Sequence, residues 1–186
     1  MNESTNSLVS MLKALEKRRD DRGLMADLRA GLKDNTQMKA WPYLARFCDL
    51  NDRYRADVFR TMAGLFASHP LECRGEGMGR LCRRLCDQDE MKSLGGGAAF
   101  SEDAKEGPVT KRVKQLLDSD RDEICERVVR IVLYAKSKDI PVDYHALADD
   151  LLHWGDRVRR RWAQDFWGGA WADAPAAQGG EEGGVV

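Results

Sequence analysis

Apolar residues recur at helical spacing along most of the chain, and this pattern limits the possible folds more than any other feature of the sequence. It is clearest towards the C-terminus, where a helix turns by about 100° per residue and five apolar side chains fall within about 40° of one line. These five are Leu147, Leu151, Trp154, Val158 and Trp162. Alternating apolar and polar runs, which are typical of strands, are few, and the chain has only five prolines. We therefore predict an all-α protein that forms a compact helical bundle, with two helical sub-bundles joined by a Gly-rich linker as one option.

Changes in composition divide the 186 residues into five parts. We expect a disordered lead-in at 1–7, an N-terminal helical part at 8–94, a linker or loop at 95–108, a C-terminal helical part at 109–170 and a disordered acidic tail at 171–186. Three consecutive glycines followed by a polar run indicate the linker. The tail is rich in Gly and Ala and has few apolar residues to bury, which is typical of disorder.

Two local signals indicate where helices are interrupted or begin. Gly23 breaks the leucine repeat between Leu8 and Leu32, so this region can hold two helices. Further along, Ser119 and Asp122 resemble a capping box in which Asp takes the place of the usual Glu. We therefore expect Ser119 to cap the helix that follows it.

The last predicted helix carries the densest group of cations. Asp143 can cap this helix, which we expect to run from about Tyr144 to Trp167. Within it, the stretch DRVRRRWAQDFW places four arginines in five positions, close to two tryptophans. The arginines lie off the apolar line, and they are Arg157, Arg159, Arg160 and Arg161.

Two interpretations of these arginines stay open. Arg160 has Asp156 four residues before it and Arg161 has Asp165 four residues after it, so both can pair within the helix. Neither Arg157 nor Arg159 has an acid at such a position. The group is therefore either a solvated charged face or a phosphate-binding surface in which Arg157 and Arg159 make the contacts.

The overall charge shows that any nucleic-acid contact must be local. The formal net charge is −1, and without the tail 30 basic residues stand against 28 acidic ones. This balance is far from the strongly basic one of a typical nucleic-acid domain. Smaller basic clusters occur elsewhere, at Arg18–Arg22, Arg80–Arg84 and Lys111–Lys114.

No part of the sequence predicts membrane insertion or export. Apolar runs fall far short of the roughly 18 residues that a membrane span needs, and the N-terminus lacks the pattern of a signal peptide. We therefore expect a cytoplasmic protein with no membrane partner. Its five cysteines are then expected to be reduced thiols.

Two groups of residues could hold a metal, and we expect neither to do so. His69, Cys73, Cys82 and Cys86 have ligand types that suit zinc, but the last two lie on the apolar side of a predicted helix. His145, Asp149 and His153 share one helix face but would span about 12 Å, too far for one ion. The chain has no phosphate-loop, nucleophile-elbow or HExxH signature. We expect no cofactor, no metal and no enzymatic activity.

Several stretches, taken in order, resemble the CasB family, the small subunit of the type I-E CRISPR surveillance complex Cascade. They include DRGLMADLRAG, TMAGLFASHP, GMGRLCRRL, TKRVKQLL, IPVDYHALADDLLHW and RRRWAQDFW, and together they span about residues 20–167. Val113 replaces the phenylalanine usual in the family, and Asp156 stands where some members are basic. The order and spacing of these stretches carry the resemblance, since each one alone is mostly apolar patterning.

The resemblance implies a non-catalytic, all-α subunit that works with other Cascade subunits. Two copies would pack head-to-tail along the inner face of the complex, where they would line the guide RNA–target DNA hybrid and help to hold the displaced single-stranded DNA. The basic positions that match the family, and that we expect to bind nucleic-acid backbone, are Arg29, Arg53, Arg80, Arg112, Arg130, Arg157 and Arg159. A purely structural adaptor that bridges larger subunits is the alternative, and a metal-dependent nuclease using His145, Asp149 and His153 is a third hypothesis.

Overall fold

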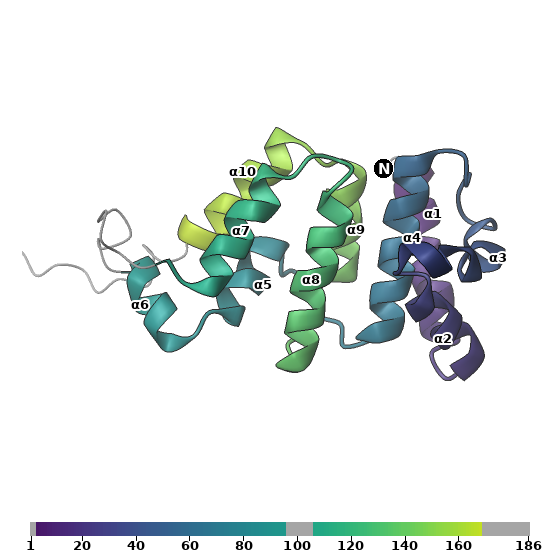
Figure 1. Cartoon of the computed structure of the whole chain (residues 1–186), viewed down its shortest axis with the longest axis horizontal. Helices are drawn as coiled ribbons and strands as arrows, with labels where there is room; N and C mark the ends of the chain where they lie inside the picture. Colours follow the sequence, from purple (N-terminus) through teal and green to yellow (C-terminus); the bar gives the residue numbers. More distant parts are fainter. Residues whose placement is uncertain (1–2, 96–105, 169–186) are drawn as a thin grey trace, which may run out of the picture.

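In the computed structural model, which describes residues 3–95 and 106–168, the chain is folded almost entirely into helices (Figure 1). Extended pairing over these ranges is limited to one isolated parallel bridge between Glu72 and Val142. The all-α prediction is confirmed. Of the helices in the described ranges, none has both the length and the apolar character to cross a bilayer.

The N-terminal helices pack around one buried helix, α4 (Arg53–Ser68). The others are α1 (Glu3–Lys17), α2 (Arg22–Ala30), η1 (Asp34–Lys39) and α3 (Trp41–Leu44). The disordered lead-in expected at 1–7 is wrong for residues 3–7, because α1 begins at Glu3 and Thr5 is already buried. Two helices do replace the long leucine repeat, but the break lies before Gly23, where the Asp21 side chain accepts a hydrogen bond from the Leu24 amide at 3.0 Å.

The remaining helices do not divide at the Gly-rich segment. They are α5 (Met78–Leu85), α6 (Gln88–Gly95), α7 (Pro108–Asp118), α8 (Ile124–Ser137), α9 (Tyr144–Leu152), α10 (Asp156–Ala163) and η3 (Gln164–Gly168). Helices α8 and α9 lie in the middle of the molecule, with α1 and α4 on one side and α5, α7 and α10 on the other (Figure 1). One buried apolar cluster runs through all of these layers. Helix α5 packs on α7, α10 and η3, so the packing of the described helices continues across the segment expected at 95–108. Residues 96–105, like the expected tail at 171–186, lie outside the described residues.

The single last helix that the sequence predicts is also wrong. Helix α9 ends at Leu152, and α10 begins at Asp156 after an extended Gly155. The five apolar residues of the predicted stripe are nevertheless all buried. Trp154 lies within the break, and its ring centroid is 4.9 Å from that of Trp162. Both large rings therefore pack in the same core across the break.

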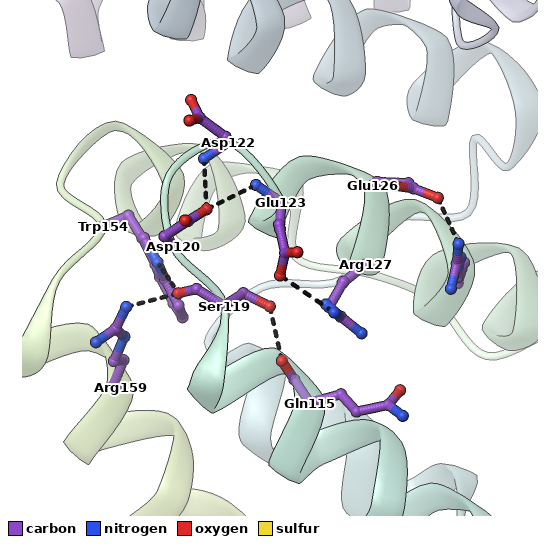
Figure 2. A network of polar contacts seen from close by, with 10 residues as sticks. Gln115, Ser119, Asp120, Asp122, Glu123, Glu126, Arg127, Trp154 and Arg159 are labelled. Atoms are coloured by element: carbon purple, nitrogen blue, oxygen red, sulfur yellow. Dashed lines mark hydrogen bonds and ion pairs between the residues drawn. The ribbon is translucent and has the colours of Figure 1, made fainter.

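The turn between α7 and α8 is capped by a different residue from the one expected (Figure 2). Ser119 ends α7, and its hydroxyl donates to the Gln115 carbonyl at 2.6 Å. Asp120 instead holds the turn that precedes α8, because its Oδ1 receives hydrogen bonds from the amides of Asp122 at 3.0 Å and Glu123 at 3.1 Å. The Ser119 capping box is wrong because its hydroxyl is already used by the preceding helix. The expected Asp143 cap is confirmed, with bonds from His145 and Ala146.

Glu90 of α6 caps the start of α7 from outside that helix. Its carboxylate is buried and accepts hydrogen bonds from the Thr110 amide at 2.6 Å, the Thr110 hydroxyl at 2.7 Å and the Val109 amide at 3.3 Å. A Cβ on Gly107 would lie 2.2 Å from the Glu90 carboxyl carbon, so only glycine leaves room for this contact. The negative charge also lies at the positive end of the helix dipole, which is favourable.

We predict that Glu90→Ala lowers the free energy of unfolding by about 1–3 kcal/mol, because three buried donors at the start of α7 lose their acceptor. Asp89→Ala is the matched control, since the neighbouring Asp89 side chain is 95% exposed and the change should stay within about 0.5 kcal/mol. Denaturant unfolding followed by circular dichroism measures both variants. Equal midpoints for the two would show that α7 does not depend on this cap.

Candidate nucleic-acid interface

Arg159, expected to contact phosphate, is engaged by the protein itself (Figure 2). Its Nη2 donates to the Ser119 carbonyl at 2.6 Å, and its Nη1 lies 3.6 Å from the Asp156 carboxylate. The guanidinium also lies over the Trp154 ring, 5.4 Å from the centroid. These contacts tie α10 to the end of α7, so Arg159 has a structural role whether or not it reaches phosphate.

The pairing expected for Arg160 and Arg161 within their helix is wrong. Arg161 forms an ion pair with Asp150 of α9 instead of Asp165. Asp150 is buried and also accepts a hydrogen bond from the Trp162 indole at 2.6 Å. Because the chain breaks between α9 and α10, Arg161 meets a carboxylate of the preceding helix. Asp156 pairs with Arg159, which leaves Arg160 without an ion pair to any residue in the described ranges.

Two of the expected contact residues carry an exposed cation with no local partner. Over residues 3–95 and 106–168, neither Arg157 nor Arg53 has a hydrogen bond or an ion pair from its side chain. Both lie at the start of a helix, Arg157 in α10 and Arg53 in α4. An unpaired guanidinium keeps all of its donors available for an external acceptor.

Arg112 and Arg130 lie on two helices that pack against each other, α7 and α8. The guanidinium of Arg112 lies 4.9 Å from the centroid of the Tyr134 ring, and the Lys138 ammonium lies at the same distance. Lys138 also donates to the Leu85 carbonyl at 3.0 Å. Arg130 lies one turn before Tyr134 and pairs with Glu126, but both side chains are more than 60% exposed, so the pair is weak. We name Arg112, Arg130, Tyr134 and Lys138 the α8 surface.

Arg29 lies in a second basic region, which includes Lys136 in the last turn of α8. Its Nε donates to the Ala67 carbonyl at 2.8 Å. Arg29, Arg19 and Lys136 line one groove of about 270 Å³ that has no acidic residue in its lining. Lys136 and Lys138 are two residues apart, so this groove and the α8 surface both reach the C-terminal end of α8. Arg159 lies at the opposite end of α8, about 20 Å away along a helix of 14 residues.

Arg80 lies among carboxylates. It is 3.8 Å from Asp165, and the neighbouring Arg84 forms an ion pair of 2.6 Å with Glu76. The surface around Arg80 is therefore close to neutral, and α5 offers less positive charge than its sequence suggests.

The two candidate metal sets are not assembled. In the parts of the chain that the structure describes, no three His, Cys, Asp or Glu side chains are placed to hold one ion. Burial raises the pKa of the Cys73 thiol to about 11 and that of Cys86 to about 12, which disfavours the thiolate that zinc requires. His69 instead faces the Ile140 carbonyl at 2.7 Å.

The proposed nuclease triad is also divided between partners. His145 lies 3.6 Å from Glu72, whereas His153 lies 3.2 Å from Asp149. Burial and the nearby charge of Arg74 lower the pKa of His145. The three side chains therefore do not form one catalytic group.

Comparison with known families identifies the family to which the chain belongs. The sequence model described as CRISPR-associated protein Cse2 matches residues 24–167, most of the chain. The chain belongs to the Cse2 family. No curated protein sequence matches it significantly.

Solved structures share the Cse2 fold. A Cse2-family protein from Thermus thermophilus is 26% identical, and the alignment covers 90% of this chain and 99% of that chain with a TM-score of 0.63. CasB from Thermobifida fusca is 21% identical over 89% and 98% of the two chains, with a TM-score of 0.59. A chain in the structure of a CRISPR RNA-guided surveillance complex is 19% identical over 88% and 92%, with a TM-score of 0.64. The resemblance to the CasB family is confirmed.

Sequence reasoning missed several residues that complete the basic regions of this Cse2-family chain. Lys136 and Lys138 stand in the last turns before Pro141, where cations commonly complement the helix dipole. Their position near a helix end could be predicted from the sequence. Their proximity to Arg29 and Arg112 could not, because it depends on how α8 packs against α4 and α7. Tyr134 gave no signal beyond helical spacing.

We predict that Asp150→Ala lowers the free energy of unfolding by about 1–3 kcal/mol, chiefly because the buried Trp162 indole loses its acceptor. Asp149→Ala is the matched control, because the Asp149 carboxylate is 46% exposed and forms only a surface pair with His153. Urea unfolding followed by tryptophan fluorescence reports both changes. A wild-type midpoint for Asp150→Ala would show that the indole finds another partner.

Proposed function

We propose that this protein is a non-catalytic small subunit of a type I-E CRISPR RNA-guided surveillance complex, acting in the cytoplasm with the other Cascade subunits and a second copy of itself. Its arginines bind nucleic-acid backbone without sequence preference, and so stabilise the guide RNA–target DNA hybrid and the displaced strand. Membership of the Cse2 family over residues 24–167 carries this proposal. The likeness to a chain of a surveillance complex supports it.

The distribution of charge supports backbone binding. Exposed cations with little or no carboxylate competition occur at the α8 surface, at the Arg19–Arg29–Lys136 groove, and at Arg53 and Arg157. Guanidinium groups suit phosphate oxygens, and phosphate contacts carry no base sequence. A subunit that must accept any target needs contacts of this kind.

A structural adaptor is the second candidate, and one observation favours it. Several family-matched arginines already have protein partners: Arg29 on the Ala67 carbonyl, Arg80 on Asp165 and Arg159 on the Ser119 carbonyl. If the exposed cations pair in the same way with carboxylates of larger subunits, the chain bridges proteins without touching DNA.

We predict that Arg157→Gln and Arg112→Gln each weaken R-loop formation by the assembled complex. Each lost phosphate contact should flatten the log–log dependence of affinity on salt by about 0.7–0.9 units. The weakening should be similar for different target sequences, since phosphates are the same in all of them. The measurement is R-loop affinity of complexes rebuilt with each variant at several salt concentrations.

Arg159→Gln serves as the contrasting variant. It removes a hydrogen bond to Ser119 and a contact with Trp154, so we expect it to cost about 1–2 kcal/mol of stability, whereas Arg157→Gln should leave stability unchanged. If Arg157→Gln and Arg112→Gln together change neither affinity nor salt slope, the adaptor is the better description.

A further inference from the structure

Trp41 is unusually exposed for its residue type. Tryptophan is highly buried on average, yet 40% of Trp41 is accessible to solvent, whereas Trp154 and Trp162 are buried. Its indole has no ring, cation–π or hydrogen-bond partner in the described parts of the chain. Trp41 begins α3, where Pro42 fixes the first turn and the buried Tyr43 and Leu44 anchor the helix. The ring is thus held on a rigid element while part of its surface stays open.

Trp41 forms one wall of a groove of about 230 Å³ between α3 and α4. Leu44, Leu50 and Ala56 give the groove further apolar surface, and Arg53, the first residue of α4, also lines it. An apolar ring beside a cation is the pairing that holds a nucleotide, because the base stacks on the ring while the cation meets the phosphate.

The charges around the groove leave Arg53 available. Asp57 also lines it, but its carboxylate is engaged by Arg60 through hydrogen bonds of 3.1 Å and 3.2 Å. Arg60 in turn donates to the Gly31 carbonyl at 3.0 Å, so it is fixed within the protein. Arg53 is therefore the lining cation without a partner in the described residues.

We propose that this groove binds one unpaired nucleotide of single-stranded nucleic acid, with Trp41 as the stacking platform for the base and Arg53 as the contact for its phosphate. The inference rests on the proposed function and makes it more specific, because it assigns a site that distinguishes unpaired strands from paired ones. In a duplex, both faces of each internal base are covered by its neighbours, so only an unpaired strand can present a base to Trp41. Stacking on a ring tolerates every base, which agrees with binding that ignores sequence.

The test uses the full-length protein and a 20-nucleotide single-stranded DNA of mixed sequence at low salt, with affinity measured by fluorescence anisotropy. Trp41→Leu keeps an apolar side chain but removes the ring, and should weaken binding about 5- to 150-fold, the equivalent of ~1–3 kcal/mol for one stacked base. Trp41→Phe should retain most of the affinity. Arg53→Gln should flatten the salt dependence by about 0.7 units, whereas Trp41→Leu should leave that slope unchanged.

An abasic oligonucleotide of the same length separates stacking from other effects. Wild-type protein should bind it about as weakly as Trp41→Leu binds the normal strand, and Trp41→Leu should cause no further loss. Met38→Ala is the matched control, because Met38 is a nearby apolar residue, 62% exposed, that does not line the groove. A 5-iodouracil strand should photocrosslink to Trp41, as located by mass spectrometry.

The proposal is overturned if the wild-type chain does not bind single-stranded DNA, or if Trp41→Leu weakens binding equally for normal and abasic strands. It is also overturned if the only defect of the Trp41→Leu protein is that it fails to assemble with the other subunits. The last would show that the groove receives a protein side chain. If Trp41→Leu changes nothing while Arg112→Gln and Arg157→Gln still flatten the salt dependence of R-loop formation, this site is refuted and the proposed function stands.

Discussion

The carbonyl of Ser119 determines how the C-terminal helices meet. It accepts hydrogen bonds from the Trp154 indole at 3.1 Å and from Arg159 at 2.6 Å, and so joins the end of α7 to both sides of the break between α9 and α10. A helix end leaves carbonyl groups without intrahelical partners, and here two side chains from 35 and 40 residues away satisfy one of them. This one acceptor thus holds Trp154, within the break, and Arg159, after it, and it engages the Arg159 cation within the protein.

Local chemistry explains what the sequence could predict. Apolar spacing identified the buried residues of the C-terminal helices, because burial of a helix face depends only on which residues share it. The same spacing could not reveal the break after Leu152, since Trp154 and Val158 are buried in either arrangement. The Ser119 cap failed for a related reason: a serine between two helices can serve either, and only the geometry of the turn decides.

Predictions about charge were weaker because ion pairs are formed in three dimensions. Sequence spacing paired Arg161 with Asp165, but Asp150 is closer in space once α10 turns away from α9. Similarly, Lys136 joins Arg29 through the packing of α8 near α2 and α4 and not through any motif. The net charge of −1 is compatible with binding to a nucleic-acid backbone because several carboxylates accept hydrogen bonds from groups within the protein. Asp150, Asp57 and Glu90 are examples. The cations available to a ligand are those that have no acidic partner within the fold.

This division of the cations has a consequence for recognition. Phosphate contacts from exposed arginines hold any nucleic acid, double- or single-stranded, because both present the same backbone charge. A subunit that binds only by such contacts would not favour an opened target over an intact duplex. The proposed site at Trp41 and Arg53 would supply the missing discrimination, since a base could reach the Trp41 ring only after the strands have separated. On this proposal, α7 and α8 would supply affinity for the nucleic-acid backbone, and α3 and α4 would supply selectivity for unpaired strands. Because the two sites use different helices, a substitution could change one without disturbing the other.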